Sequence, residues 1–266
     1  MEFLVQQEHL SKALEKAAQT NGHEDAVTIL GYQVSSRLGD DHTSNTADVV
    51  AVQVDYEYRA AKRHRSFIFK VPFNHPHYEI IRKLGMYHTE NTMYATVLPK
   101  LNALLQQPIS PECYLLANHD TLVLENLTAR GYRNGPTKLD FDHCVVLLKT
   151  VAKFQAASYK VGQLDRTLLT VVPQKQLYQI GAMAVMNDKL CSLYERLMHE
   201  EGIEASSAEK LRALNSELNA SSTDAEATTD VFDFEVLNHG SLKSANVMFR
   251  YDLQGRRSVS ARFVDF

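Results

Sequence analysis

The chain has 266 residues, enough to bury a substantial core as one two-lobed domain or two smaller ones. Its hydrophobic content of 44% and charged content of 23% are ordinary for a globular protein, and its net charge of −4 gives no reason to expect nucleic acid or an acidic membrane as partner. No apolar run approaches the roughly 20 residues of a membrane helix. The 3 cysteines lack the spacing of a zinc site, and the first residues lack the pattern of a signal peptide. We therefore expect a soluble cytoplasmic protein.

The first part of the chain is predicted to form one helix followed by strands. Residues 3–20 place Leu10, Leu14 and Ala17 on one face of an amphipathic helix. Alternating or apolar runs then predict strands at 27–34, 49–58 and 66–73, and a hairpin of strands at 113–117 and 121–127.

The segment 59–65 between two of these strands is strongly basic. Two interpretations are open: a solvated hairpin tip, or a patch that binds phosphate or nucleic acid. The absence of an interleaved aromatic side chain favours the hairpin tip.

Lys70 is the unusual residue of the strand 66–73. The period of two puts Phe67 and Phe69 on one face and Ile68 and Lys70 on the other. A lone ammonium in so apolar a strand needs an anionic partner, because burying it unpaired is costly. The alternative is that Lys70 reaches solvent at the end of the strand.

A helix predicted at 76–98, ended by Pro99 or continuing briefly to Leu105, carries a candidate partner for Lys70. Glu90 would meet the ammonium if this helix packs beside the strand. A solvated surface glutamate is the alternative, as for most helix glutamates.

The second half of the chain is more helical. A turn-rich connector at 128–136 is a candidate hinge between lobes. Asp140 is a good N-cap for a helix over 140–159, and a further helix is predicted at 174–199. The core face predicted for the first of these helices consists of Cys144, Leu147, Leu148, Val151, Phe154 and Ala157.

The stretch 237–249 has the layout of a kinase catalytic loop. His239 and Gly240 precede Asn246, an apolar strand follows, and a second strand ends in Asp265 and Phe266. In such loops an aspartate stands five residues before the asparagine and accepts the proton of the attacking hydroxyl. Ser241 holds that place here.

Three segments together resemble the insect ecdysteroid-kinase-like family, also described as choline-kinase-like and related to aminoglycoside kinases. Residues 122–127 with Gly131 resemble the family's hinge, L-V-L-E-D-L-x-x-x-G. Residues 90–99 are similar to its E-x-x-x-Y-x-x-x-L-P helix, and residues 236–249 to V-L-x-H-G-D-x-W-x-N-N-x-M-F. The resemblance extends over nearly the whole chain.

The resemblance implies an α+β, protein-kinase-like fold of two lobes. Residues 1–130 would form a nucleotide-binding lobe with the hinge near its end, and 131–266 part of a helical lobe. The implied function is transfer of phosphate from ATP, with Mg²⁺, to a hydroxyl of a small metabolite such as an ecdysteroid. Nucleotide and metabolite would be the partners, with no nucleic acid and no membrane.

The resemblance also implies roles for individual residues. Lys70, held in place by Glu90, would pair with the α- and β-phosphates, and Gly39 would lie in a phosphate-covering loop. Backbone groups near Glu125 and Leu127 would take the adenine edge, and Asn246 and Asp265 would hold Mg²⁺ through oxygen atoms. His239 would support the loop, and Ser241 stands at the catalytic position.

The chain departs from the family pattern at several places. Ser241 replaces the catalytic aspartate, Lys243 and Ala245 replace a tryptophan and an asparagine, and Gln155 stands where a histidine is usual. The sequence ends at Phe266, where the family continues, so we expect a truncated copy or a fragment. A positioned base contributes roughly 10²–10⁴-fold in rate. Two hypotheses follow: an ATP-dependent kinase, or a pseudokinase that binds a nucleotide or ligand without transfer.

Overall fold

The structure is a computed structural model that describes residues 5–19, 27–35, 47–73, 86–117, 120–170, 235–255 and 257–266, with residues 196, 210 and 213. The chain divides into two compact units, Met1–Val172 with Val236–Phe266, and Pro173–Glu235. The elements below belong to the first unit. The predicted loop around Gly39 and the predicted helix 174–199 lie outside the ranges described. Within those ranges, no helix has the length and apolar character needed to cross a membrane.

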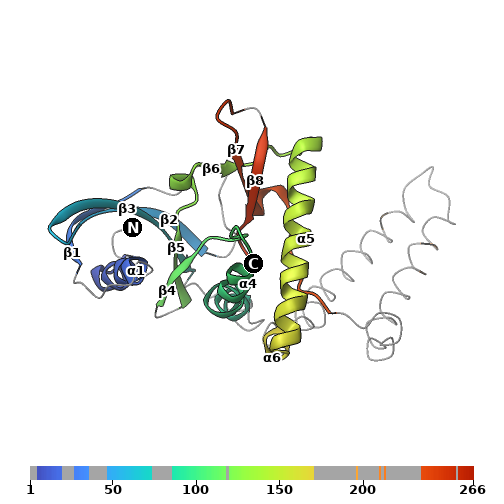
Figure 1. Cartoon of the computed structure of the whole chain (residues 1–266), viewed down its shortest axis with the longest axis horizontal. Coiled ribbons are helices and arrows are strands. Elements are labelled where there is room, and N and C mark those ends of the chain that lie inside the picture. The colour runs from blue at the N-terminus through green and yellow to red at the C-terminus, as the bar shows by residue number, and fades with distance from the viewer. Residues whose placement is uncertain are drawn as a thin grey trace. The chain divides into compact units, whose positions relative to one another are not determined.

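An antiparallel sheet forms the N-terminal region, with the strand order β1-β2-β3-β5-β4. Phe67 and Phe69 point to one face of this sheet, where they share a buried cluster with Leu10 and Leu14 of α1 (Gln7–Gln19). Figure 1 shows α1 lying against the curved strands. The strands are β1 (Thr28–Val34), β2 (Ala47–Tyr58), β3 (Ala61–Pro72), β4 (Cys113–Ala117) and β5 (Thr121–Glu125). The predicted amphipathic helix and its buried face are confirmed.

The hairpin between β2 and β3 turns more tightly than the basic segment 59–65 suggested. Arg59 and Ala60 have φ angles of 55° and 57°, the left-handed conformation of a two-residue hairpin turn that matches strand twist. Ala61 already pairs with Tyr58, and Arg65 with Val54. Most of the basic segment is therefore strand, and the tip is confined to two residues.

Three consecutive helical elements follow: α3 (Met86–Thr92), a π-helical segment η3 (Met93–Val97) and α4 (Leu98–Leu104). Pro99 does not end the helix. It lies in the first turn of α4, where a missing N–H costs little. The predicted residues 76–85 lie outside the described ranges.

A second sheet is built from β6 (Tyr132–Asn134), β7 (Val247–Tyr251) and β8 (Ser258–Phe263), in that order. The helix α5 (Phe141–Leu164) runs alongside this sheet (Figure 1). Its Phe154 contacts Phe263 edge to face. The Asp140 side chain accepts a hydrogen bond from the His143 N–H at 3.0 Å, which confirms the predicted N-cap. The remaining short elements are η5 (Thr128–Arg130), α6 (Thr167–Thr170) and η7 (Ser244–Asn246).

The buried face of α5 is rotated from the predicted one. Phe154 and Ala157 are buried as predicted, but Leu148 is 66% exposed. The buried positions also include His143 and Thr150. Both polar side chains have partners: His143 bonds the Tyr251 hydroxyl at 2.8 Å, and Thr150 donates to the carbonyl of Val146. Polar residues with partners can be buried, and a pattern of apolar residues alone does not detect them.

The predicted α+β class is confirmed, with an antiparallel five-stranded sheet in the N-terminal region and a long helix after it. The proposed lobe boundary at residues 130 and 131 stays a prediction.

Candidate functional site

Lys70 and Glu90 form a buried ion pair. Lys70 lies near the end of β3 and Glu90 in α3, and the Nζ–Oε1 distance is 2.5 Å. The same ammonium also donates to the carboxylate of Asp265, which follows β8. Both Lys70 and Glu90 are buried, so the alternatives of a lysine reaching solvent and a surface glutamate do not apply. Three separate segments of the chain therefore meet at one ammonium group.

The charges of this group explain its protonation. Burial lowers the pKa of Lys70, but the carboxylates of Glu90 and Asp265 outweigh burial and hold the pKa above its ordinary value. Lys70 is therefore charged at neutral pH. Burial raises the pKa of Glu90, with Lys70 opposing this effect and Asp265 adding to it. One ammonium faces two carboxylates, so a further positive charge beside the group is electrostatically favourable.

Asp265 is held in an unusual backbone conformation. Its φ angle is 65°, which costs a non-glycine residue free energy and is found where the surroundings enforce it. The Asp265 N–H donates to the Tyr94 hydroxyl at 3.1 Å, and the Val264 N–H donates to the Asn246 carbonyl at 3.0 Å. These bonds direct the Asp265 carboxylate toward Lys70.

Aromatic contacts join the same segments. Phe266 lies edge to face with Tyr94 of η3, with ring centroids 5.7 Å apart, and stacks on the His239 ring at 4.6 Å. It also contacts Phe154 of α5. The residue after Asp265 therefore contacts the helix that carries Glu90 as well as the loop that contains His239.

The loop 239–246 is closed by Asn246. The Asn246 N–H donates to the Lys243 carbonyl at 2.9 Å, and the side-chain Nδ2 donates to the Ser241 carbonyl at 2.9 Å. Asn246 is buried, whereas Ser241 and Lys243 are exposed. Nearby, the Gln155 amide donates to the Asn238 side chain at 3.1 Å.

His239 is a neutral side chain bonded to the backbone of Val264. Burial lowers its pKa, partly opposed by its bond to the backbone carbonyl of Val264 at 3.1 Å. Because a carbonyl can only accept, Nε2 carries the proton. That proton is already committed to the backbone, which agrees with a supporting role.

The donor atoms suit a magnesium ion. The Asn246 Nδ2 is used by the Ser241 carbonyl, so the amide oxygen is the atom left for a cation. Asp265 supplies a carboxylate, and its side chain is 42% exposed. Mg²⁺ prefers oxygen ligands and commonly takes one or two from protein and the rest from water and phosphate. Over the described ranges there is no group of three or more His, Cys, Asp or Glu that could hold a metal ion.

At the hinge, the side chain of Glu125 is engaged by arginines, and the Leu127 carbonyl accepts the N–H groups of Arg130 and Tyr132. Because its carbonyl is already used, Leu127 would contact an adenine edge through its backbone N–H. Gly39, the residue expected to cover phosphates, is outside the described ranges.

Sequence reasoning gave no role to Tyr94 and missed Arg262. Tyr94 is the tyrosine of the E-x-x-x-Y motif, and its spacing of four residues from Glu90 could have indicated a shared role. Arg262 carries no local signal, since its partner Glu125 is 137 positions away.

The fold and this arrangement are those of a kinase-like protein. Residues 41–266 match the model of the ecdysteroid kinase-like family. The chain belongs to that family, as the resemblance of its motifs predicted. No curated protein and no solved structure matches the chain.

Proposed function

We propose that the protein binds ATP with Mg²⁺ and transfers a phosphoryl group to a hydroxyl of a small metabolite, such as an ecdysteroid, at a rate lowered by Ser241. The single observation that carries this proposal is the buried ammonium of Lys70 between Glu90 and Asp265. Such an ammonium, fixed by carboxylates, can bind phosphate oxygens as a charged donor. Family membership supports the reaction class.

Each residue of the group has a definite task in this proposal. Lys70 binds the α- and β-phosphates, and Glu90 keeps the ammonium in place. Asn246 and Asp265 hold Mg²⁺, which neutralises charge on the phosphates when bound. His239 and Tyr94 orient the loop and Asp265 through their backbone contacts. Backbone groups at Glu125 and Leu127 bind the adenine edge.

Ser241 supports a second candidate function, nucleotide binding without transfer. A serine hydroxyl does not accept a proton usefully at neutral pH, although it can hydrogen-bond a substrate hydroxyl. Phosphoryl transfer depends mainly on positioning and charge neutralisation, so binding can persist where the base is absent. The free thiols of Cys113 and Cys144 support a reducing location, and we propose the cytoplasm for either function.

The test combines binding with turnover. Wild-type protein is melted with and without Mg-ATP, and phosphate transfer is measured to a panel of ecdysteroids and other hydroxylated metabolites. Ligand at about 100 times its Kd should stabilise the protein by roughly 2.7 kcal/mol. Transfer that depends on the added alcohol supports the kinase. A melting shift without any transfer supports the second candidate.

A matched lysine controls for charge. Lys100 is exposed and pairs with Asp165 at 3.4 Å. Lys70→Met should abolish the Mg-ATP shift, whereas Lys100→Met should keep it. An absent shift in the wild type, or an equal shift in Lys70→Met, would refute both functions.

A further inference from the structure

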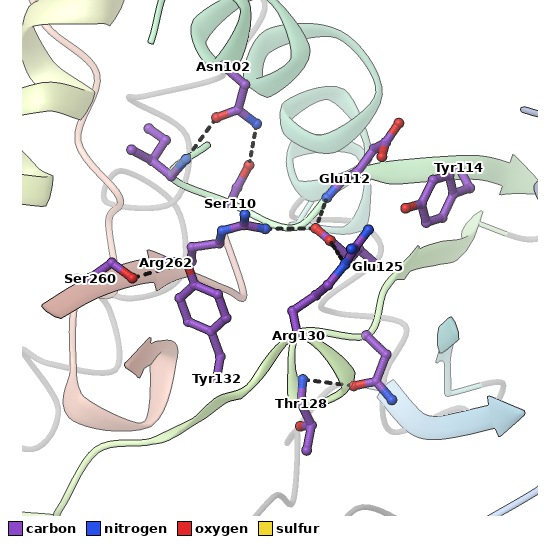
Figure 2. Close-up of polar contacts among 12 residues, drawn as sticks. Asn102, Ser110, Glu112, Tyr114, Glu125, Thr128, Arg130, Tyr132, Ser260 and Arg262 are labelled. Carbon is purple, nitrogen blue, oxygen red and sulfur yellow. Dashed lines mark hydrogen bonds and ion pairs between the residues drawn. The ribbon is translucent and has the colours of Figure 1, made fainter. Parts of the chain in front are cut away.

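A second charged cluster surrounds Glu125 at the end of β5. Its Oε2 accepts from Arg262 Nη1 at 2.7 Å and its Oε1 from Arg130 Nε at 2.9 Å. Figure 2 shows the carboxylate between the two arginines, with Glu112 beside it. The backbone N–H of Glu112 approaches the same carboxylate at 3.4 Å, and the Glu125 N–H donates to the Glu112 carbonyl at 2.8 Å. Both oxygens of Glu125 are therefore occupied.

The pair formed by Glu125 and Arg262 is shielded from solvent. Their side chains are 11% and 13% exposed, whereas Arg130 is 59% exposed. The Arg262 guanidinium also lies over the Tyr132 ring, 5.0 Å from its centroid (Figure 2). A shielded, charge-assisted bond backed by an aromatic ring holds its geometry more firmly than an exposed pair.

The location of this pair connects the two sheets of the unit. Glu125 ends β5 of the five-stranded sheet, where the candidate hinge begins. Arg262 lies in β8 of the three-stranded sheet, three positions before Asp265. The pair therefore fixes the hinge against the strand that leads to the candidate metal ligand.

We infer that Glu125 and Arg262 are positioning residues that set the span between the hinge and Asp265, so that one nucleotide can reach both ends. This inference rests on the proposed function. A nucleotide bound by its base at the hinge must present its phosphates to Lys70 and Asp265. A misplacement of about 1 Å along such a span can lower the rate of the catalysed reaction by up to about 100-fold.

The competing explanation is an ion pair that stabilises the fold and nothing more. The two explanations differ in which ligands they affect. Mg-ATP contacts both ends of the span, whereas adenosine contacts the hinge end alone. A positioning pair therefore affects Mg-ATP selectively, and a purely structural pair weakens both ligands alike or neither.

The experiment measures Kd for Mg-ATP and for adenosine by calorimetry, well below the melting temperature of each protein. The variants are Arg262→Met, Glu125→Gln and the double variant. Arg250→Met is the matched control, since Arg250 lies 5.5 Å from the centroid of the same Tyr132 ring but is exposed. Circular dichroism establishes that each protein is folded.

We expect Arg262→Met to raise the Kd for Mg-ATP about tenfold and to change the Kd for adenosine less than about twofold. The double variant should bind Mg-ATP no more weakly than the weaker-binding single variant, because the two residues act as one pair. Arg250→Met should leave both constants near wild type. If Arg262→Met does not fold, the same ratio measured on Glu125→Gln decides.

Equal weakening of both ligands, or no change in either, overturns the positioning role while leaving the proposed function standing. A wild type that binds neither ligand overturns the proposed function and this inference with it. The two failures are therefore distinguishable.

Discussion

The group around Lys70 and the loop 239–246 lie close together but differ in completeness. Lys70 and Glu90 form a buried ion pair, and the partly exposed Asp265 adds a second carboxylate to the same ammonium. In the loop, the backbone N–H of Asn246 donates to Lys243 and its side chain donates to the carbonyl of residue 241. That residue is Ser241, which has no carboxylate. In the proposed function, the first region would bind phosphate, whereas the second lacks the carboxylate that would accept a proton.

The bond that closes the loop is made to the backbone at position 241 and not to its side chain. The Asn246 amide bonds the Ser241 carbonyl, an atom that every residue at this position possesses. The loop can therefore keep its shape after loss of the carboxylate. Binding and transfer should then respond to different substitutions, and each prediction below tests that separation.

The largest effect is expected from Ser241→Asp. A positioned carboxylate base should raise the rate of phosphate transfer by roughly 10²–10⁴-fold, about 3–5 kcal/mol in the barrier, without changing the affinity for Mg-ATP. Single-turnover transfer to an accepted alcohol measures this rate. Ser244→Asp, in the same loop, is the control and should have no such effect. A variant that binds Mg-ATP but is no faster than wild type would count against a loop that is ready for catalysis.

Removing Lys70 should mainly affect stability and binding. Lys70→Met leaves Glu90 buried without its cation, and breaking a buried pair in this way typically costs about 3 kcal/mol or more. Urea unfolding measures the loss, with the exposed Lys100→Met as control. Equal unfolding midpoints for the two variants would contradict a buried, paired lysine.

A smaller effect is expected from Tyr94→Phe. The Tyr94 hydroxyl accepts from the Asp265 N–H at 3.1 Å, and its loss should cost about 1 kcal/mol in stability. We also expect weaker Mg-ATP binding, since Asp265 would lose a backbone restraint. Tyr32→Phe in β1 is the control. Unchanged affinity in Tyr94→Phe would show that Asp265 is held by its other contacts.

The smallest expected effect is the contribution of His239 to the pH dependence of stability. Burial lowers the pKa of His239, so the unfolded chain takes up the proton first as pH falls below about 6.5. The contribution of His239 to stability is therefore present above that pH and is lost as pH falls through its folded pKa. Between pH 7.5 and pH 5.0, the urea midpoint should fall less in His239→Gln than in wild type. An identical acid dependence in the two proteins would refute this, and His64→Gln, at an exposed site, controls for loss of a histidine.

The need of Lys70 for an anionic partner could be predicted because its signal is local, whereas Glu90 as that partner was implied by the resemblance to the family. The period of the strand separated Lys70 from Phe67 and Phe69, and a buried ammonium requires an anion. The N-cap at Asp140 was predictable for the same reason, since its bond to His143 spans three positions. The roles in binding or catalysis assigned to the site residues remain predictions: Gly39, Lys70, Glu90, Glu125, Leu127, His239, Ser241, Asn246 and Asp265.

Other features depend on contacts that no local pattern contains. The bond from Lys70 to Asp265 spans 195 positions, and its geometry depends on the positive φ of Asp265. The face of α5 was predicted with Leu148 inside because apolar residues occur around much of that helix. His143 can be buried because it bonds the hydroxyl of Tyr251, which lies 108 positions later in the sequence.

The π-helical segment Met93–Val97 sets the angular register between the two ends of one long helix. Glu90 lies before this segment, whereas Leu98 and Leu101, which anchor the helix in the core, lie after it. A π turn contains one more residue than an α turn, and each residue of an α-helix turns the chain by about 100°. Winding the same residues as regular α-helix would therefore rotate Glu90 by about 100° away from Lys70, although every side chain stayed the same. At this point the type of helical turn matters to the charged group as much as the identity of the residues.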